Sequence, residues 1–520
     1  MRNSVRAFSL VGRIGAGDRL EDRMDRRLAA EELVVRLGDW NAERDVLYRS
    51  LAAAIERLIG EGQLPPRTVL PAERGLAQRL NVSRGTVMAA YEVLRERALV
   101  ATVHGSGTVV LRAGSPVSGP REAHLTTELP HDSLLVGHGS PCPDHLDLRS
   151  ASWMGAEAMQ GISTERLDAR MNEVAASDRY DGLGSCGLRA AIAAHLTATG
   201  LPTRSDEVLI TSGAQQAIAL TMQLYVAAGD HVLAEEPTYP GAIEAMVAQQ
   251  ARVHRVPVGP AGLELPALRS AVERVRPRLT YVVASVHNPT GFVMLSAARQ
   301  RLAELLAGWE TVLLDDTTLL ETQIDGDAPP PLAAYADPDT AQRILTIGSI
   351  SKSVWEGLRI GWIRASATTI VRLARLKSIA DLGTPSLTQA IAEELLQNPM
   401  ALFEKRRNQL AERRAAMAEL LRAHLPSWSW TMPTGGLCFW VDTGRHDSVA
   451  FCKTAGRHGV AIIPPEVSSS TSRHSGHLRV PYALPVGALE EAAVRLGAAW
   501  RDHVSQHPCP VRQVRMSVAG

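Results

Sequence analysis

Short apolar runs that alternate with helical segments constrain the fold of this 520-residue chain more than any other feature. From about residue 141, five of these runs have the length of buried strands: 208–211, 231–235, 279–284, 311–314 and 344–348. Strands that alternate with helices are typical of an α/β domain with a mostly parallel sheet. Polar motifs follow these strands, and the carboxyl ends of parallel strands meet at one edge of the sheet. The sequence therefore predicts a functional site at that edge.

A lysine follows the last of these strands. Lys352 is one of only four lysines among 55 Lys and Arg residues, so a chain that otherwise uses arginine has kept a lysine here. A lysine amine in a suitable pocket can form a Schiff base with an aldehyde, which arginine cannot do. Ser349, Ser351 and Arg359 lie close by in the sequence and carry side chains that suit a phosphate. The alternative is a surface lysine in a loop.

Composition bounds the remaining possibilities. Apolar residues make up 45% and charged residues 21% of the chain, as in soluble globular proteins. Lys plus Arg and Asp plus Glu balance at 55 each, so the overall charge predicts no partner. The five cysteines form no Cys-x-x-Cys pair, which argues against a zinc site or a disulfide framework and favours a reducing cytoplasm. No apolar run approaches about 18 residues, so no membrane span is expected.

Residues 45–112 carry the pattern of a small helical unit. Apolar residues repeat at helical spacing over 45–59, and further helices are predicted over 72–80 and 84–98. Two helices joined by a turn of three or four residues make a helix-turn-helix. The segment 99–111 alternates around a glycine-rich turn, which predicts a hairpin, or wing.

The residues that would face a major groove favour DNA binding by this unit. A helix of about fifteen residues fits the groove when its first turn carries contacting side chains. Ser83, Arg84 and Thr86 occupy that turn, and Arg74 lies in the preceding helix. Residues 41–112 also hold ten Arg against seven Asp and Glu. We expect an operator-binding unit; the alternative is a three-helix protein-interaction module.

The motifs LPAERGLA, NVSRGTV and GSGT in this unit resemble the winged helix of the GntR family of regulators. The resemblance implies that Arg74, Arg84, Thr86 and Gly107 lie at the DNA. Arg67 is a departure, because the family usually has a glycine there. It changes a turn rather than the residues that contact DNA.

The rest of the chain divides by composition and periodicity. Residues 1–40 predict a disordered or loosely helical extension before the DNA-binding domain, which we place at 41–112. Residues 113–140 lack periodicity and predict a flexible linker. The α/β domain then occupies 141–505, and a tail follows over 506–520.

The α/β part resembles fold-type I aminotransferases over roughly residues 145–500, and its fusion to a GntR-like winged helix is the arrangement of the MocR-like regulators. The resemblance implies pyridoxal 5′-phosphate as the cofactor, a homodimer, and a small C-terminal α+β part beside the mostly parallel sheet. The residues that match cofactor-binding positions are Ser212, Gly213, Ala214, Gln215, Tyr239, Asn288, Asp315, Ser349, Ser351, Lys352, Arg359 and, reaching the neighbouring subunit, Tyr180.

By resemblance, residues 212–215 match the turn that binds the phosphate, and Tyr239 matches the aromatic side chain that stacks on the ring. Asn288 matches the donor to the ring oxygen. Asp315 matches the carboxylate that pairs with the pyridinium nitrogen and keeps the ring an electron sink. Lys352 matches the lysine that forms the imine with the cofactor.

Near the C-terminus, Arg479 matches the arginine that binds a substrate carboxylate, a bidentate task suited to guanidinium. A core position for Tyr239, a surface ion pair for Arg479 and a turn cap for Asn288 are the alternatives. One departure is Thr317, where the family has a tyrosine that reaches the ring oxygen. Threonine is too short for that contact, which favours a sensor with slow or absent turnover.

These features together predict a cytoplasmic transcriptional regulator. Its winged helix binds operator DNA, and its aminotransferase-like domain holds the cofactor as an imine with Lys352. An amine or amino-acid effector would displace Lys352, engage Arg479 and shift the domain arrangement, provided that it binds one arrangement better than the other. The alternative is a working aminotransferase that carries an incidental DNA-binding module.

Overall fold

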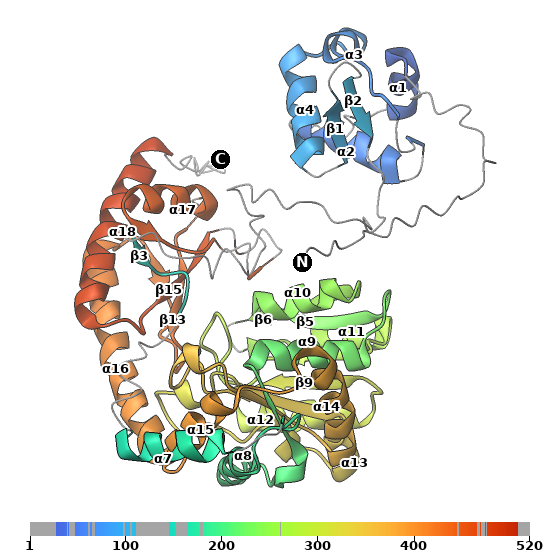
Figure 1. Ribbon diagram of the computed structural model, residues 1–520. Coiled ribbons are helices and arrows are strands. Elements are labelled where there is room, and N and C mark those ends of the chain that lie inside the picture. The colour runs from blue at the N-terminus through green and yellow to red at the C-terminus, as the bar shows by residue number, and fades with distance from the viewer. Residues whose placement is uncertain are drawn as a thin grey trace, which may run out of the picture. The chain divides into compact units, whose positions relative to one another are not determined.

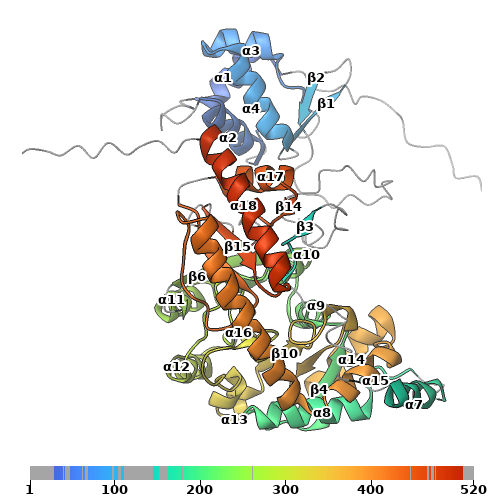
Figure 2. The same ribbon diagram turned by 90° about the vertical axis from the view of Figure 1, so that its left-hand side faces the viewer.

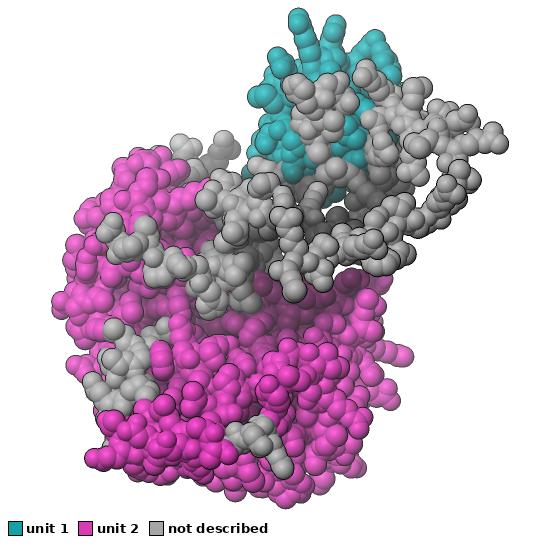
Figure 3. Space-filling view, viewed as in Figure 1, with its two compact units in different colours: residues 1–125 teal, residues 126–520 magenta. Residues whose placement is uncertain are grey.

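The computed structural model of the chain divides into two compact units, residues 1–125 and 126–520 (Figure 3). The structure describes residues 28–38, 40, 47–60, 63–64, 68–96, 99–103, 107–110, 145–151, 162, 164–176, 180–259, 262–444, 447–464, 468–469, 474 and 476–507. The predicted linker, 113–140, and most of the predicted tail, 506–520, lie outside these residues.

The described part of the smaller unit contains four helices and a hairpin (Figure 1). Its elements are α1 (Ala30–Leu37), α2 (Leu47–Gly60), α3 (Glu73–Leu80), α4 (Arg84–Glu96), β1 (Val100–Val103) and β2 (Gly107–Val110). The two strands are antiparallel, with Val103 opposite Gly107, and the tip of the hairpin lies outside the described residues. The predicted helix-turn-helix and wing are therefore confirmed.

Two local features set the angle between α3 and α4. Asn81 ends α3 in the left-handed conformation, with φ of +53°, which asparagine tolerates better than most residues. Ser83 caps α4, because its Oγ accepts a hydrogen bond from the Thr86 backbone N–H at 3.1 Å. The Tyr91 hydroxyl donates to the Pro71 carbonyl oxygen at 2.9 Å and ties α4 to the residues before α3.

Helix α1 corrects the predicted start of this unit at residue 41. Leu28, Leu33 and Leu37 are buried in the same core as the apolar faces of α2, α3 and α4. An eight-residue helix is not stable by itself and is held here by packing of its apolar face. Its short pattern of two leucines four residues apart did not distinguish it from an extension.

An eight-stranded sheet with the order β4-β11-β10-β9-β8-β5-β6-β7 forms the centre of the larger unit (Figure 1). Its strands are β4 (Val208–Thr211), β5 (His231–Glu236), β6 (Arg252–Gly259), β7 (Gly262–Leu263), β8 (Leu279–Val282), β9 (Val312–Asp316), β10 (Ile344–Ser349) and β11 (Gly361–Arg364). The neighbouring strands from β10 to β6 are parallel, whereas β11 and β7 run antiparallel to their neighbours. All five predicted strands and the mostly parallel sheet are confirmed.

Helices lie on both faces of this sheet. They are α7 (Thr164–Ala175), α8 (Cys186–Ala198), α9 (Ala214–Tyr225), α10 (Pro240–Ala248), α11 (Leu265–Val275), α12 (Ser296–Ala307), α13 (Pro338–Ala341), α14 (Ala367–Asp381) and α15 (Ser386–Leu395). Successive strand residues point to opposite faces, so Leu314 packs with α9, α10 and α14, and Leu313 packs with α11 and α12. This alternation decides which end residues of β9 face the site.

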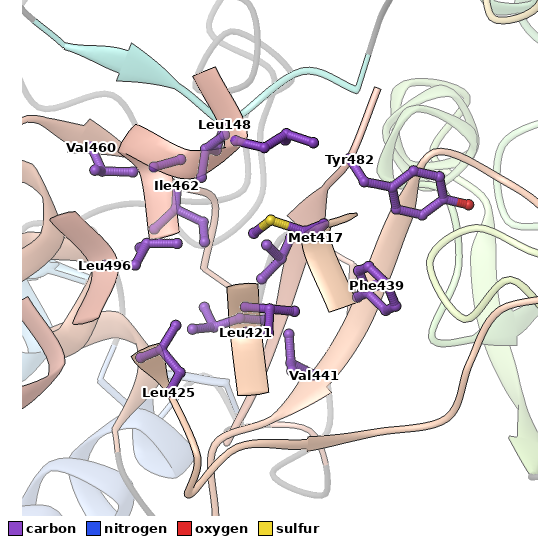
Figure 4. Close-up of a cluster of buried hydrophobic side chains, with 14 of the residues drawn as sticks. Leu148, Met417, Leu421, Leu425, Phe439, Val441, Val460, Ile462, Tyr482 and Leu496 are labelled. Carbon is purple, nitrogen blue, oxygen red and sulfur yellow. The ribbon is translucent and has the colours of Figure 1, made fainter. Parts of the chain in front are cut away.

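The C-terminal part of the larger unit is a smaller α+β layer, as predicted. It contains α16 (Pro399–His424), α17 (Ser448–Arg457), α18 (Val486–Gln506), an antiparallel sheet of β12 (Ser429–Trp430), β13 (Cys438–Asp442) and β15 (His477–Pro481), and the parallel pair β14 (Val460–Ala461) and β3 (Leu146–Asp147). Helices α16 and α18 lie side by side over this layer (Figure 2). Phe439, Met417, Leu421 and Leu496 are fully buried in its core (Figure 4).

Within the part of the chain that the structure describes, no helix combines the length and apolarity needed to cross a membrane.

Leu33→Ala tests whether α1 belongs to the DNA-binding unit. We expect this change to destabilise the unit by about 2–5 kcal/mol, because Leu33 is fully buried and its truncation leaves a cavity. Val35→Ala in the same helix is the control, since Val35 is 81% exposed. Hydrogen exchange over residues 73–96, measured by mass spectrometry in the full-length protein, reports the effect. Equal protection in both variants would contradict the assignment.

Candidate functional site

A cavity of about 390 Å³ lies where the parallel strands of the large sheet end. Tyr239 follows β5, Asn288 follows β8 and Lys352 follows β10, and all three line this cavity. Cys438 on β13 and Arg479 on β15 line it from the small α+β layer. The predicted residues that the cavity brings together are Ala214, Gln215, Tyr239, Asn288, Ser349, Ser351, Lys352, Arg359 and Arg479.

Lys352 lies in the turn after β10, and 27% of its side chain is exposed. Its Nζ donates to the Ala151 carbonyl oxygen at 3.1 Å and to Glu356 Oε2 at 3.3 Å. Burial lowers the pKa of Lys352; Glu356 opposes this shift, and the positive charges of Arg479 and Arg359 add to it. A lowered pKa increases the fraction of neutral amine, which is the form that attacks a carbonyl carbon.

The start of α9 forms one end of the cavity. Ala214 and Gln215 in its first turn line the cavity, and the N-terminus of a helix presents unpaired backbone N–H groups to an anion. Gly213 has φ of +95°, and a Cβ there would lie 2.8 Å from Nη2 of Arg359, so this position requires glycine. Arg359 Nη2 donates to the Ser212 carbonyl oxygen at 2.7 Å. Ser212 and Gly213 therefore shape the turn through their backbone.

Two serine hydroxyls lie at the same end. Ser349 Oγ lies 2.9 Å from Ser351 Oγ and 2.8 Å from the Ile360 carbonyl oxygen. Both side chains are buried and line the cavity. Together with Arg359 and the start of α9, they make an anion-binding end.

Tyr239 and Asn288 line the part of the cavity beside Lys352. Tyr239 is the residue before α10. Burial raises the pKa of Tyr239 to about 12, and the negative charge of Asp316 contributes, so its phenol stays neutral at physiological pH. Asn288 is half-buried and begins the turn after β8. An aromatic ring and an amide therefore face the same space.

Asp316, rather than the predicted Asp315, faces the cavity. Asp316 lines it and accepts hydrogen bonds from the Tyr281 hydroxyl at 2.7 Å and the Thr318 backbone N–H at 2.9 Å. Asp315 points to the opposite face of β9, where it accepts from the Leu332 backbone N–H at 2.8 Å. The correction follows from the alternation of side chains along a strand, since two adjacent carboxylates cannot face the same side.

The predicted role of Thr317 is corrected for the same reason. Its hydroxyl is buried and donates to the Ile347 carbonyl oxygen at 2.7 Å, so it faces neighbouring β10 rather than the cavity. Thr318 and Leu319 line the cavity instead. Neither of them carries the phenol that the family resemblance implies beyond the aspartate.

Three buried acidic side chains lie close together: Glu235 on β5, and Asp315 and Asp316 on β9. Burial raises the pKa of Glu235 to about 8. A hydrogen bond from the Val283 backbone N–H lowers this pKa, and the charges of the two aspartates raise it. Burial also raises the pKa of Asp315, to about 6, and that of Asp316. Glu235 therefore keeps its proton at pH 7, and the negative charge stays on β9.

His287 is the neutral neighbour of Glu235. Its Nε2 lies 3.6 Å from Glu235 Oε2, and its Nδ1 lies 2.8 Å from Thr290 Oγ1. Burial lowers the pKa of His287 to about 3, so the imidazole is uncharged at pH 7. His287 lines the cavity, and the pair therefore adds polarity there without adding net charge.

Arg479 and Cys438 lie on neighbouring strands of the small layer. Arg479 lines the cavity, and its Nη2 donates to the Arg149 carbonyl oxygen. Burial raises the pKa of the Cys438 thiol to about 11, so the thiol is uncharged where it lines the cavity. Tyr180 lies elsewhere: it is 83% exposed and does not line the cavity.

The DNA-contact residues predicted in the smaller unit lie at its surface. Arg74, Ser83 and Arg84 are exposed, and Thr86 is half-buried. Arg84 Nη2 lies 3.2 Å from Glu73 Oε2, a surface ion pair that a phosphate can replace at small cost. The backbone of Gly107 begins strand β2, next to the tip of the wing.

Several cavity residues had no sequence signal strong enough for prediction. Arg149, Ser150 and Ala151 line the cavity but lie in a stretch without periodicity. Tyr281 looks like a core residue of a predicted strand. Glu356 could have been found, because it lies four residues after Lys352 and one helical turn brings such side chains together.

Two family models match the chain. The model of aminotransferase class I and II matches residues 162–496, and that of bacterial regulatory proteins, gntR family, matches residues 47–110. An uncharacterized HTH-type transcriptional regulator of Bacillus subtilis, YisV, is 27% identical over 473 residues, which cover 87% of this chain and 96% of that protein.

Two further relatives are similar to the larger unit. A 2-aminoadipate transaminase of Thermus thermophilus is 32% identical over 300 residues, 57% of this chain and 76% of that protein. The crystal structure of LysN, an alpha-aminoadipate aminotransferase of Thermus thermophilus complexed with N-(5′-phosphopyridoxyl)-L-leucine, superposes with a TM-score of 0.64 and 28% identity, covering 70% of this chain and 94% of that one.

Glu235→Gln tests the buried acidic cluster. In the unfolded chain Glu235 loses its proton near its ordinary pKa, whereas in the folded protein it keeps the proton up to about pH 8. The free energy of unfolding of the wild type should therefore fall as pH rises between these values. The variant should gain stability relative to wild type by up to about 1.4 kcal/mol per pH unit. Calorimetry from pH 5 to 8, with the exposed Glu490→Gln as control, measures the difference; parallel profiles would refute it.

Proposed function

We propose that this chain, which belongs to the aminotransferase class I and II family and joins that domain to a gntR-family domain in the MocR-like arrangement, is an effector-controlled transcriptional regulator. The observation that carries the proposal is the cavity itself. It keeps a lysine, a carboxylate, an aromatic ring and an anion-binding end in one place, in a chain that also carries a helix-turn-helix.

The cavity residues fit pyridoxal 5′-phosphate. The start of α9, Arg359, Ser349 and Ser351 suit its phosphate, and the ring of Tyr239 gives a flat surface for the pyridine. Asp316 offers a buried carboxylate to the ring nitrogen, and Tyr281 holds that carboxylate in place. When bound, the cofactor supplies an aldehyde carbon and an electron-withdrawing ring. Lys352 supplies the amine that bonds to this carbon.

The effector is an amine or amino acid in this proposal. Arg479 lines the cavity from β15 and suits a carboxylate on the effector. A carboxylate there competes with the Arg149 carbonyl oxygen for the guanidinium group. Binding of the effector therefore changes the contacts of residues 149–151, which follow the predicted linker in the sequence.

The smaller unit binds operator DNA through α4 in the major groove. Arg84, Ser83 and Thr86 at the start of α4 contact the DNA, with Arg74 on α3 and the wing at Gly107 beside them. The regulator acts in the cytoplasm as a homodimer, so that two half-sites are bound at once. Tyr180 then reaches the phosphate of the neighbouring subunit, in keeping with its exposure in the single chain.

A working aminotransferase is the second candidate, because the cavity keeps the lysine, the carboxylate and the aromatic ring. The two candidates differ in the fate of Lys352 after an effector has bonded to the cofactor. Transamination requires the lysine to move protons, whereas sensing does not. Steady conversion of an amino acid to a keto acid favours the enzyme. A spectral change without product, together with altered operator affinity, favours the regulator.

Lys352→Ala tests the cofactor site. The wild type supplied with pyridoxal 5′-phosphate should show a visible absorbance band that shifts when an amine is added. The variant should lose this band, because Lys352 is the only lysine among the described residues that line the cavity. The exposed Lys405→Ala is the matched control and should keep the band. A colourless wild type, or an absorbance band that persists in Lys352→Ala, would contradict the cofactor assignment.

Arg84→Ala tests the DNA-binding face. We expect operator affinity to fall about 5- to 150-fold, which corresponds to about 1–3 kcal/mol for one lost arginine contact. Fluorescence anisotropy at fixed salt measures the affinity. The exposed Arg57→Ala on α2 is the control for the loss of one positive charge. The cofactor absorbance should not change in either variant. Equal operator affinities of the two variants would contradict the placement of α4 in the major groove.

A further inference from the structure

Glu356 begins the 3-10 turn Glu356–Leu358, one helical turn after Lys352, and its carboxylate reaches into the cavity. Glu356 Oε2 accepts hydrogen bonds from Lys352 Nζ at 3.3 Å and from Ser150 Oγ at 3.2 Å. Lys352 Nζ also donates to the Ala151 carbonyl oxygen at 3.1 Å. The lysine ammonium group therefore lies between a carboxylate and a carbonyl.

Binding of the cofactor does not explain a carboxylate at this position. Asp316 already serves the ring nitrogen, and the phosphate end is built from Arg359, serine hydroxyls and backbone N–H groups. A second negative charge in the same cavity repels the phosphate. Glu356 therefore needs a cation as its partner, and Lys352 is the cation in the cavity that it contacts.

We propose that Glu356, oriented by Ser150, and the Ala151 carbonyl hold the ammonium group of Lys352 whenever its nitrogen is not bonded to the cofactor. The proposal rests on the function proposed above. The contacts need the N–H donors of a primary ammonium group. A lysine nitrogen bonded to the aldehyde carbon has given up most of these donors, so the two acceptors select the released lysine.

The effector supplies the charge that this site receives. After its ammonium group has lost a proton, the effector nitrogen would bond to the aldehyde carbon, and the bond from that carbon to the Lys352 nitrogen would break. The two protons that the effector nitrogen loses are gained by Lys352, so one positive charge enters on the effector and one remains on the released lysine. Glu356 lies where that charge appears, and it therefore favours the effector-bound state.

Charged and titratable groups on three elements lie near Lys352. Glu356 and Arg359 belong to the turn that follows the lysine, Arg479 comes from β15, and the neutral thiol of Cys438 comes from β13. The two arginines oppose a positive charge on the lysine, and Glu356 opposes their effect. Glu356 raises the pKa of Lys352 against burial and the two arginines, so it reduces the fraction of neutral amine that could act as a base in turnover. Glu356 is thus a positioning residue that favours sensing.

Glu356→Gln tests this role without the cofactor. In protein freed of cofactor, trace labelling with acetic anhydride from pH 6 to 10, followed by mass spectrometry, reports the reactivity of Lys352. We expect Lys352 in the variant to react about two- to fivefold faster at pH 7, because its ammonium form has lost a partly exposed ion pair. The exposed Lys405 and Lys453 serve as internal standards.

Two further variants separate charge from structure. Glu356→Asp keeps the carboxylate and should stay close to wild type, and the exposed Glu490→Gln should not change the profile of Lys352. A wild-type profile in Glu356→Gln would overturn the proposal. The same change in Glu356→Asp and Glu356→Gln would overturn it as well, because it would indicate a structural role that does not depend on charge.

Binding equilibria give a second readout. Glu356→Gln should bind pyridoxal 5′-phosphate about two- to fivefold more tightly, and the probe ethylamine should displace Lys352 less readily by a similar factor. Unchanged equilibria would count against the proposal. If the wild type shows no cofactor absorbance, the proposed function fails, whereas the labelling experiment still decides whether Glu356 holds the Lys352 ammonium.

Discussion

The site depends on the hydrogen-bonded register of four parallel strands. Asp316 on β9 is paired with Ile347 on β10, and Asp315 is paired with Val282 on β8, so the ends of these strands are fixed against one another. A slip of one residue in β9 would turn Asp315 towards the cavity and Asp316 away from it. The buried side chains on both faces of the sheet oppose such a slip, because it would move Leu313 and Leu314 each to the face on which the other packs. Packing of the core therefore sets the chemistry of the cavity.

Charge is distributed unevenly around the cavity. The negative charge of the cavity floor is confined to β9, because Glu235 holds its proton and His287 is neutral at pH 7. Positive charge comes from Arg359, next to the start of α9, and from Arg479 on β15. Burial and these two arginines lower the pKa of Lys352. A molecule that carries both a phosphate and a carboxylate is complementary to two such arginines.

Much of the fold and of the site could be predicted from sequence, since short apolar runs and capping residues are local signals. The five predicted strands, the helix-turn-helix and the lysine turn depend on such signals. The predictions that were wrong concern features that depend on tertiary packing. Asp315 and Asp316 lie on opposite faces of β9, and only one of these faces borders the cavity. Two adjacent aspartates in the sequence do not indicate which face that is. Helix α1 has too few apolar residues to be recognised without the core that it packs into.

The segment 149–151 lies against the side chains to which the proposed function assigns roles. Its three consecutive residues contact three functional side chains: the Arg149 carbonyl accepts from Arg479, the Ser150 hydroxyl donates to Glu356, and the Ala151 carbonyl accepts from Lys352.

The pairing of β3 with β14 fixes the chain just before this segment to the small α+β layer. A ligand shifts an equilibrium only through contacts that differ between two states. A bond to Lys352 removes a donor from Ala151, and a carboxylate on Arg479 removes one from Arg149. The bonding of this segment thus differs with the state of the site, and the segment follows in the sequence the stretch that leads from the DNA-binding unit.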